Sequence, residues 1–358
     1  MAERTLVIAE AGVNHNGSLD LALQLVDVAA DAGADIVKFQ TFKAEKLATS
    51  RAKKAEYQVE NTGEAGSQLD MLRRLELKPE HHHTLIARCN ERGIRFMSTA
   101  FDADSLAFLG TLGMPAIKIP SGDITAGPLV LQAARLGLPL IVSTGMSTLR
   151  DIEDALSLLA FGLTSKATPT SWRDCEAAWA SPAGQAALRE RVTLLHCTTE
   201  YPAPPASVNL RAMDTMAAAF GLPVGYSDHT QGIDISLAAV ARGAVIIEKH
   251  FTLDRSLPGP DHAASLEPDE LTRLVQGIRT IEAALGSGRK HASTSEQPNK
   301  AVARRSLVAA RPIHRGELLS EDMLACKRPG TGVSPMQLWD VVGRPATRDY
   351  DLDEPLEN

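Results

Sequence analysis

The chain has 358 residues, a formal net charge of −7 and 44% hydrophobic residues. This length suffices for one large core and a small second domain. The acidic balance argues against nucleic acid or an anionic membrane as a partner. The sequence contains no apolar run of about 18 residues that would predict a membrane span, and its first residues predict no secretory signal. The four cysteines lie far apart, so we expect reduced thiols in a cytoplasmic protein.

Short β-branched runs recur along the first 250 residues, and segments with helical periodicity separate them. We expect eight strands, at 5–9, 34–39, 94–98, 116–119, 140–143, 192–196, 223–226 and 244–248. A glycine precedes six of them by one to three residues, where a helix would end in a left-handed residue: Gly33, Gly93, Gly113, Gly137, Gly221 and Gly243. Alternating strands and helices predict a parallel sheet. Eight strands favour a closed (β/α)8 TIM barrel over a doubly wound open sheet.

Three segments depart from a minimal barrel. Residues 40–93 are expected to fold over the barrel mouth, and residues 161–191 to form an inserted helical segment. The polar stretch after residue 285 is rich in Gly and Ser and predicts a linker. We therefore divide the chain into a barrel domain at 1–285, a linker at 286–303 and a small C-terminal domain at 304–358.

Polar side chains stand at the carboxyl end of every predicted strand, which is where a parallel barrel carries its chemistry. They are Glu10, Lys38, Gln40, Thr99, Lys118, Ser121, Asp123, Ser143, Thr144, Thr199, Tyr201, Ser227, Asp228, His229, Glu248 and His250. Taken singly, such residues are more often solvated side chains or helix caps. Their convergence from all eight strands indicates a functional site.

Two histidines and two lysines in this group indicate which ligands the site would bind. His229 and His250 end the seventh and eighth strands, which are neighbours in a barrel, so both imidazoles could reach one cation. Two histidines are too few for a structural zinc site. An open site completed by water and substrate oxygens suits Mn²⁺ or Mg²⁺ better, and imidazole favours Mn²⁺. Lys38 and Lys118 near that cation predict the binding of a phosphate or a carboxylate.

Other histidines lie outside this group. His81, His82 and His83 follow Pro79 in the first turn of an expected helix, and we predict that they are exposed. His15 lies in the first loop near the mouth, where it is a candidate for a substrate contact.

Nine ordered motifs stand out along nearly the whole chain. They are IAEAGVNHNG, GADIVKFQTF, FMSTAFD, IKIPSGD, STGMS, LHCTTEYPAP, VGYSDHT, EKHFTLDRSLPGPDHAAS and the C-terminal RRSLVAARPIHRGE with KRPGTG. Together they resemble the sialic acid synthase family. The resemblance implies a (β/α)8 barrel followed by an antifreeze-like (SAF) domain. It also implies a metal-dependent transferase of the N-acetylneuraminate synthase type, which condenses phosphoenolpyruvate with open-chain N-acetylmannosamine into a nine-carbon 2-keto acid and phosphate.

The same resemblance implies roles for individual residues. Phosphoenolpyruvate would be held by Lys38, Thr99, Lys118, Ser121, Ser143, Thr199 and Ser227. The sugar would face Gln40, Asp123, Tyr201 and Asp261. His229 and His250 would hold the divalent metal, Mn²⁺ with Mg²⁺ or Co²⁺ as alternatives, and Glu10, Lys118 and His229 would be catalytic. A domain-swapped homodimer would bring Arg328 of one subunit to the N-acetyl sugar of the other.

Several alternatives remain open at this point. Asp123 stands where many family members have Glu, and TTEYPAP, IPSGDIT and EKHFTLD look closer to N,N'-diacetyllegionaminate synthases, which use 2,4-diacetamido-2,4,6-trideoxymannose. A synthase of seven- or eight-carbon keto acids that acts on phosphorylated sugars is another enzymatic alternative. The remote alternative is a non-enzymatic sugar- or ice-binding protein. Ice binding favours a flat uncharged face, whereas the C-terminal segment carries Arg311, Arg315 and Glu317.

Overall fold

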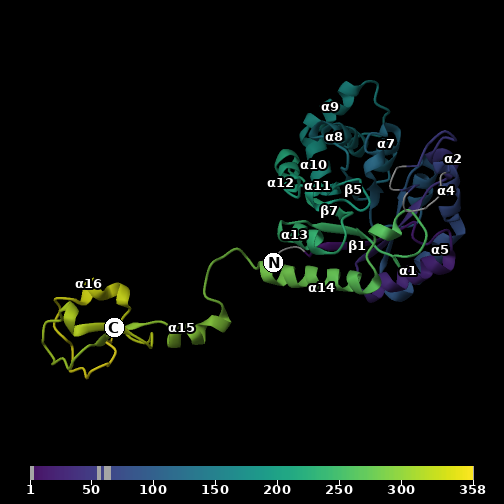
Figure 1. The fold of residues 1–358 in the computed structure, drawn as a ribbon. Coiled ribbons are helices and arrows are strands. Elements are labelled where there is room, and N and C mark those ends of the chain that lie inside the picture. The colour runs from purple at the N-terminus through teal and green to yellow at the C-terminus, as the bar shows by residue number, and fades with distance from the viewer. Residues whose placement is uncertain (1–3, 55–57, 60–65, 358) are drawn as a thin grey trace. The chain divides into compact units, whose positions relative to one another are not determined.

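A computed structural model describes residues 4–54, 58–59 and 66–357. The chain divides into two compact units, Met1–Ser287 and Gly288–Asn358. In the first unit, eight parallel strands pair in chain order and close into a barrel (Figure 1). The predicted (β/α)8 barrel is thus confirmed, and the open doubly wound sheet is excluded.

The eight strands all overlap their predicted ranges. They are β1 (Leu6–Gly12), β2 (Ile36–Thr41), β3 (Arg95–Ala100), β4 (Ile117–Ile119), β5 (Leu140–Ser143), β6 (Val192–Cys197), β7 (Val224–Asp228) and β8 (Ile246–His250). Six of them continue one to three residues beyond the predicted end. The predictions followed the apolar residues and therefore ended too early. The polar residues that come next still pair with the neighbouring strands.

Helices follow the strands around the barrel. They are α1 (Leu19–Asp31), α5 (Pro79–Arg92), α6 (Ala103–Leu109), α7 (Gly127–Arg135), α8 (Leu149–Thr164), α12 (Ala212–Phe220), α13 (Asp234–Ala241) and α14 (Pro268–Leu285), with short helices α11 (Pro205–Val208), η1 (Ser121–Asp123) and η2 (His262–Ala264). Helix α1 begins after Ser18, whose hydroxyl accepts the Leu21 N–H. Within the part of the chain that the structure describes, no helix is long and apolar enough to cross a membrane.

The two long connections contain helices of their own. Residues 40–93 contribute α2 (Ala44–Leu47), α4 (Gln68–Leu75) and α5. The predicted helical insertion is confirmed, since residues 161–191 hold the end of α8 together with α9 (Trp172–Ala180) and α10 (Pro182–Arg191). Both α9 and α10 pack against α8 on the outside of the barrel.

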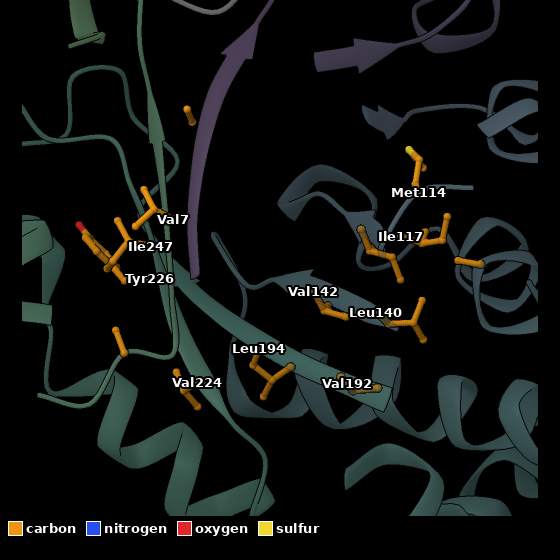
Figure 2. Packing of buried hydrophobic residues seen from close by; sticks show 14 of the residues in the cluster. Val7, Met114, Ile117, Leu140, Val142, Val192, Leu194, Val224, Tyr226 and Ile247 are labelled. Atoms are coloured by element: carbon orange, nitrogen blue, oxygen red, sulfur yellow. The ribbon is translucent and has the colours of Figure 1, made fainter. Parts of the chain in front are cut away.

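The barrel interior begins with an apolar floor. Its members form a buried cluster of their own: Ile8, Ile36, Met97, Ala116, Ile141, Leu195 and Ile246. Their neighbours Val7, Val142 and Ile247 belong instead to the larger cluster between the strands and the helices (Figure 2). Successive side chains of a strand point to opposite faces. The next inward layer therefore lies two residues further along each strand, and it consists of Glu10, Lys38, Thr99, Lys118, Ser143, Cys197, Ser227 and Glu248.

The second unit has a separate core. Strands β9 (Ser306–Ala309) and β10 (Leu324–Lys327) form a two-stranded antiparallel sheet, accompanied by η4 (Glu321–Met323), η5 (Pro335–Gln337) and α16 (Leu338–Val341). Leu307, Ile313, Val333 and Tyr350 belong to the cluster of buried side chains around this sheet.

The predicted linker is partly helical. It contains η3 (Thr294–Glu296) and α15 (Gln297–Ala303). Ser293 and Glu296 form a capping box that begins this helical turn. Composition alone predicted an irregular segment and missed this local pair.

A side chain added at Gly225 would disturb the floor. A Cβ there would lie 2.5 Å from the Ile246 carbonyl oxygen and 2.6 Å from Leu195 Cδ2. We expect Gly225→Ala to lower the free energy of unfolding by roughly 1–3 kcal/mol, measured by urea denaturation. Gly127→Ala is the control, because its Cβ would meet its nearest neighbour at 3.5 Å. Equal losses in both variants would contradict the tight packing of the floor.

Candidate active site

A cavity of about 440 Å³ lies at the carboxyl ends of the barrel strands. Fifteen residues singled out from the sequence line it: Glu10, Lys38, Gln40, Thr99, Lys118, Ser121, Asp123, Ser143, Thr199, Tyr201, Ser227, His229, Glu248, His250 and Asp261. Leu47, Gln68 and Leu72, from the segment after β2, also line the cavity. That segment therefore contributes to the mouth, as expected.

Four charged side chains are buried together at the bottom of this cavity. Lys118 Nζ donates to both carboxylate oxygens of Glu248, at 2.7 and 2.9 Å. Lys38 Nζ lies 3.5 Å from Glu248 Oε2 and 2.8 Å from Glu10 Oε2. The four side chains are at most 6% exposed. Two positive and two negative charges thus compensate each other where an unpaired charge would cost several kcal/mol.

The pKa values in this group differ from their usual ranges for identifiable reasons. Burial raises the pKa of Glu10. Burial also opposes ionisation of Glu248, but Lys118 and Lys38 outweigh it and hold the pKa of this carboxyl below its usual range. Burial lowers the pKa of Lys118, whereas at Lys38 the two glutamates outweigh burial and raise the pKa. Glu248 is therefore the stable carboxylate, and Glu10 is the group that more readily holds a proton.

Two imidazoles face each other beside this group. The ring centroids of His229 and His250 lie 5.6 Å apart, and the Tyr201 ring stacks on His229 at 4.1 Å. His229 Nδ1 donates to the Thr198 carbonyl oxygen at 2.6 Å, which leaves the lone pair on Nε2. His250 Nδ1 is buried without a hydrogen-bond partner among the described residues, and Asp261 Oδ2 lies 3.9 Å from it.

The imidazoles fit a divalent cation in an open site. Burial lowers the pKa of His229 to about 4 and that of His250 well below its usual value, so both rings are neutral, the form that ligates metals. Over residues 4–54, 58–59 and 66–357, no group of three or more His, Cys, Asp or Glu side chains is arranged to hold a metal. A cation here would therefore need water or substrate oxygens besides the two rings.

Several polar atoms around the cavity are buried without a partner in the described chain. They include Ser143 Oγ and Asp123 Oδ2. Burial raises the pKa of Asp123 to about 6, and burial with the nearby charge of Glu10 raises that of Asp261 to about 7. Because buried polar groups normally have partners, these atoms are suited to bind a polar ligand.

Ser121 is held from two sides. Its Oγ accepts the Gly145 N–H at 2.9 Å and lies 3.0 Å from Cys197 Sγ. The interpretation of the sequence gave no role to Cys197 and none to Glu248, although Glu248 was noted at its strand end. Cys197 and Glu248 each lie two residues beyond an apolar residue of the barrel floor, as Lys38 does. Because side chains on one face of a strand recur every second residue, this position could have identified both as facing the cavity.

Some sequence-based expectations do not match the structure. His82 was predicted to be exposed but is buried, because its Nε2 bonds Thr41 Oγ1 at 2.7 Å and its ring packs edge-on against Phe108. His15 is also buried; its Nδ1 accepts the Gly17 N–H, and it does not line the cavity. The structure therefore does not support His15 as a substrate contact.

Thr144 and Asp228 belong to the barrel unit but do not line the cavity, and Arg328 belongs to the C-terminal unit. Thr144 donates to the Leu195 carbonyl oxygen. The Nε of Arg328 donates to the Ala303 carbonyl oxygen at 3.0 Å. The contact of Arg328 with a sugar in a partner subunit stays a prediction.

Removing the charge of Glu248 would leave two buried lysines facing one carboxylate. We expect Glu248→Gln to lower the free energy of unfolding by roughly 3–5 kcal/mol in urea denaturation. Added inorganic phosphate should restore part of this loss, because the anion replaces the missing charge. The control Glu176→Gln changes an exposed side chain and should shift stability by less than about 0.5 kcal/mol. Unchanged stability of Glu248→Gln would contradict the charge balance described above.

Comparisons with known proteins agree with this architecture. Residues 25–290 match the model of the NeuB family, and residues 304–357 match the SAF domain. The chain is 49% identical over 352 residues to the N,N'-diacetyllegionaminic acid synthase of Campylobacter jejuni, covering 98% of each. It is 47% identical to the N,N'-diacetyllegionaminic acid synthase of Legionella pneumophila, over 94% of this chain and 89% of the relative.

A solved structure is similar as well. The N-acetylneuraminic acid (sialic acid) synthetase of Leptospira borgpetersenii matches with a TM-score of 0.66 and 35% identity, over 83% of this chain and 90% of that one. The family and the C-terminal SAF domain inferred from the nine motifs are thus confirmed. The chain belongs to the NeuB family of sialic acid synthases.

Proposed function

We propose that this enzyme is an N,N'-diacetyllegionaminic acid synthase, a transferase that joins phosphoenolpyruvate to 2,4-diacetamido-2,4,6-trideoxymannose and releases phosphate. Two relatives of that name, 49% and 47% identical over nearly the whole chain, support this sugar. The observation that carries the proposal is that two lysines and two imidazoles face one cavity. N-acetylmannosamine, the sugar first expected from the motifs, is the second candidate, and the 35% identical synthetase structure favours it.

Phosphoenolpyruvate suits the charged bottom of the cavity. Its phosphate and carboxylate would engage Lys38 and Lys118, which form ion pairs with Glu10 and Glu248. At ~4 Å and an effective dielectric constant of about 20, each contact supplies roughly 4 kcal/mol before desolvation is subtracted. Ser143 Oγ, which has no partner in the described part of the chain, is a further donor for the anion, as the family resemblance implies.

The condensation forms one carbon–carbon bond, between the enol and the sugar. It also exchanges the C2–O bond to phosphate for a C2–O bond to water. The enol C3 attacks the aldehyde carbon of the open-chain sugar, and the aldehyde oxygen takes a proton. Water adds at C2 and loses one proton, which replaces the proton taken by the aldehyde oxygen. The C2–O bond to phosphate then breaks, and the remaining hydroxyl proton passes to the leaving phosphate as the 2-keto group forms.

We assign the proton that the aldehyde oxygen takes to Glu10. Burial raises its pKa, and once the anion engages Lys38 this carboxyl loses the cation that keeps it ionised and takes up a proton. A divalent cation on His229 and His250 would polarise the aldehyde.

The sugar would lie nearer the mouth of the cavity than the buried lysines and glutamates. There it would contact Gln40, Asp123, Tyr201 and Asp261. The unpartnered Asp123 Oδ2 can accept an N–H or O–H from the sugar. Asp is one methylene shorter than the Glu that many family members have at this position, so its carboxylate reaches less far toward the sugar. The domain-swapped homodimer, with Arg328 reaching the partner's sugar, and the cytoplasmic location complete the proposal and are supported by the family resemblance.

A substrate panel tests the choice of sugar. Phosphate release from phosphoenolpyruvate should be fastest with the diacetamido-trideoxy sugar and at least about tenfold slower with N-acetylmannosamine, since an unfilled polar subsite reduces transition-state binding. Arabinose 5-phosphate should give no turnover. Lys118→Met, the control for non-enzymatic release, should be inactive with every sugar. A preference for N-acetylmannosamine would overturn the diacetamido assignment, and turnover of arabinose 5-phosphate would overturn the family chemistry.

Loss of one imidazole tests the metal assignment. His229→Ala should abolish phosphate release, and added Mn²⁺ should no longer raise the melting temperature, while circular dichroism shows a folded barrel. His83→Ala, at an exposed position of α5, is the control and should behave like the unmodified chain. Turnover by His229→Ala in the presence of Mn²⁺ would refute the assignment.

A further inference from the structure

An ion pair is buried on the outer face of the barrel, directly behind the two imidazoles. Asp228 on β7 and Lys249 on β8 are paired in the strand ladder. Lys249 Nζ lies 3.0 Å from Asp228 Oδ2, and the two side chains are 1% and 0% exposed. Neither residue lines the cavity. Neither can therefore touch a substrate, and the function proposed above leaves both without a role.

This pair is surrounded by hydrogen bonds from three elements. Asp228 Oδ1 accepts the N–H and the hydroxyl of Thr230, both at 2.8 Å, and the Tyr226 hydroxyl at 3.3 Å. Asp228 Oδ2 accepts the Ser236 hydroxyl from α13 at 2.6 Å. Lys249 Nζ also donates to the Thr230 carbonyl oxygen. The network thus joins β7, the loop that follows it, β8 and α13.

The positions of these contacts along the chain relate them to the cavity. Asp228 and Thr230 are the residues on either side of His229, and Lys249 directly precedes His250. Because side chains alternate along a strand, a group that faces the helices holds the backbone whose next side chain faces the cavity. The ion pair and its hydrogen bonds therefore act on the backbone of both histidines at once.

Stability alone does not account for this arrangement. Replacing a buried ion pair by apolar side chains of similar volume often leaves stability unchanged or raises it. A pair with this many directional partners has one favourable geometry, whereas an apolar contact tolerates small shifts. A displacement of about 1 Å in a reacting group can reduce turnover by about 100-fold, so a defined geometry matters most beside ligating side chains.

We propose that Asp228 and Lys249 are positioning residues, whose ion pair fixes from outside the barrel the register in which His229 and His250 face each other. The inference rests on the proposed binding of a divalent cation by these histidines. Loss of a group that hydrogen-bonds a metal ligand typically lowers metal affinity by about 10- to 100-fold, and we expect a loss of that order here because the ion pair holds the backbone of both ligands.

The test removes both charges together. Asp228→Asn/Lys249→Met keeps the volume nearly constant and avoids leaving one buried charge unpaired. In the metal-free full-length chain, we expect a melting temperature close to that of the unmodified protein. Mn²⁺ titration followed by the electron paramagnetic resonance signal of the free ion should show about 10- to 100-fold weaker binding. Normal Mn²⁺ affinity in this double variant would overturn the proposal.

A second ion pair on the same barrel provides the matched control. Arg279 Nη2 lies 2.9 Å from Asp35 Oδ2, near the amino ends of the strands. Asp35→Asn/Arg279→Met should leave Mn²⁺ affinity unchanged, whatever it does to the melting temperature. An equal loss of affinity in the control would show that general destabilisation weakens the site, and would overturn the positioning role.

Two further outcomes remain: failure of the double variant to fold, and no binding of Mn²⁺ by the unmodified chain. If the double variant does not fold, Ser236→Ala decides, because it removes one hydrogen bond and keeps both charges. We expect about two- to tenfold weaker Mn²⁺ binding from that loss, and unchanged affinity would overturn the proposal. Absence of Mn²⁺ binding by the unmodified chain would instead refute the proposed metal site, and the positioning role would fail with it.

Discussion

Two lysines and two glutamates inside the barrel must balance one another's charge, because all four side chains are buried. These side chains occupy the first inward layer above an apolar floor, where water cannot compensate an unpaired charge. Glu248 compensates both lysines. An anion that enters must compete with Glu10 and Glu248 for these ammonium groups, which already face the cavity.

Strand alternation relates this layer to everything around it. On β7 and β8, Ser227, Glu248 and the imidazoles face the cavity, while Asp228 and Lys249 bond to each other beneath α13. Each of these strands thus presents a reactive face and a supporting face. A substitution of Asp228 or Lys249 would therefore act on the cavity through the backbone of the two strands.

Most of the fold and much of the cavity could be predicted from periodicity. Alternating strands and helices identified eight strands, and their polar carboxyl ends identified fourteen of the residues that line the cavity. Asp261, which also lines it, came from the family resemblance alone. Partners between distant segments could not be predicted. Glu248 lies 130 residues from Lys118, so their pairing exists only because the barrel closes. The burial of His82 likewise depends on Thr41, which lies 41 residues earlier at the end of β2.

A crystal structure with phosphoenolpyruvate and Mn²⁺ bound tests the central claim most directly. We expect oxygens of the phosphate and carboxylate to lie about 3 Å from Nζ of Lys38 and Lys118, with a single Mn²⁺ ligated by His229 and His250. Both lysines still paired to glutamates, with the ligand in the neighbouring cavity lined by Met146, Val208 and Met216, would contradict it.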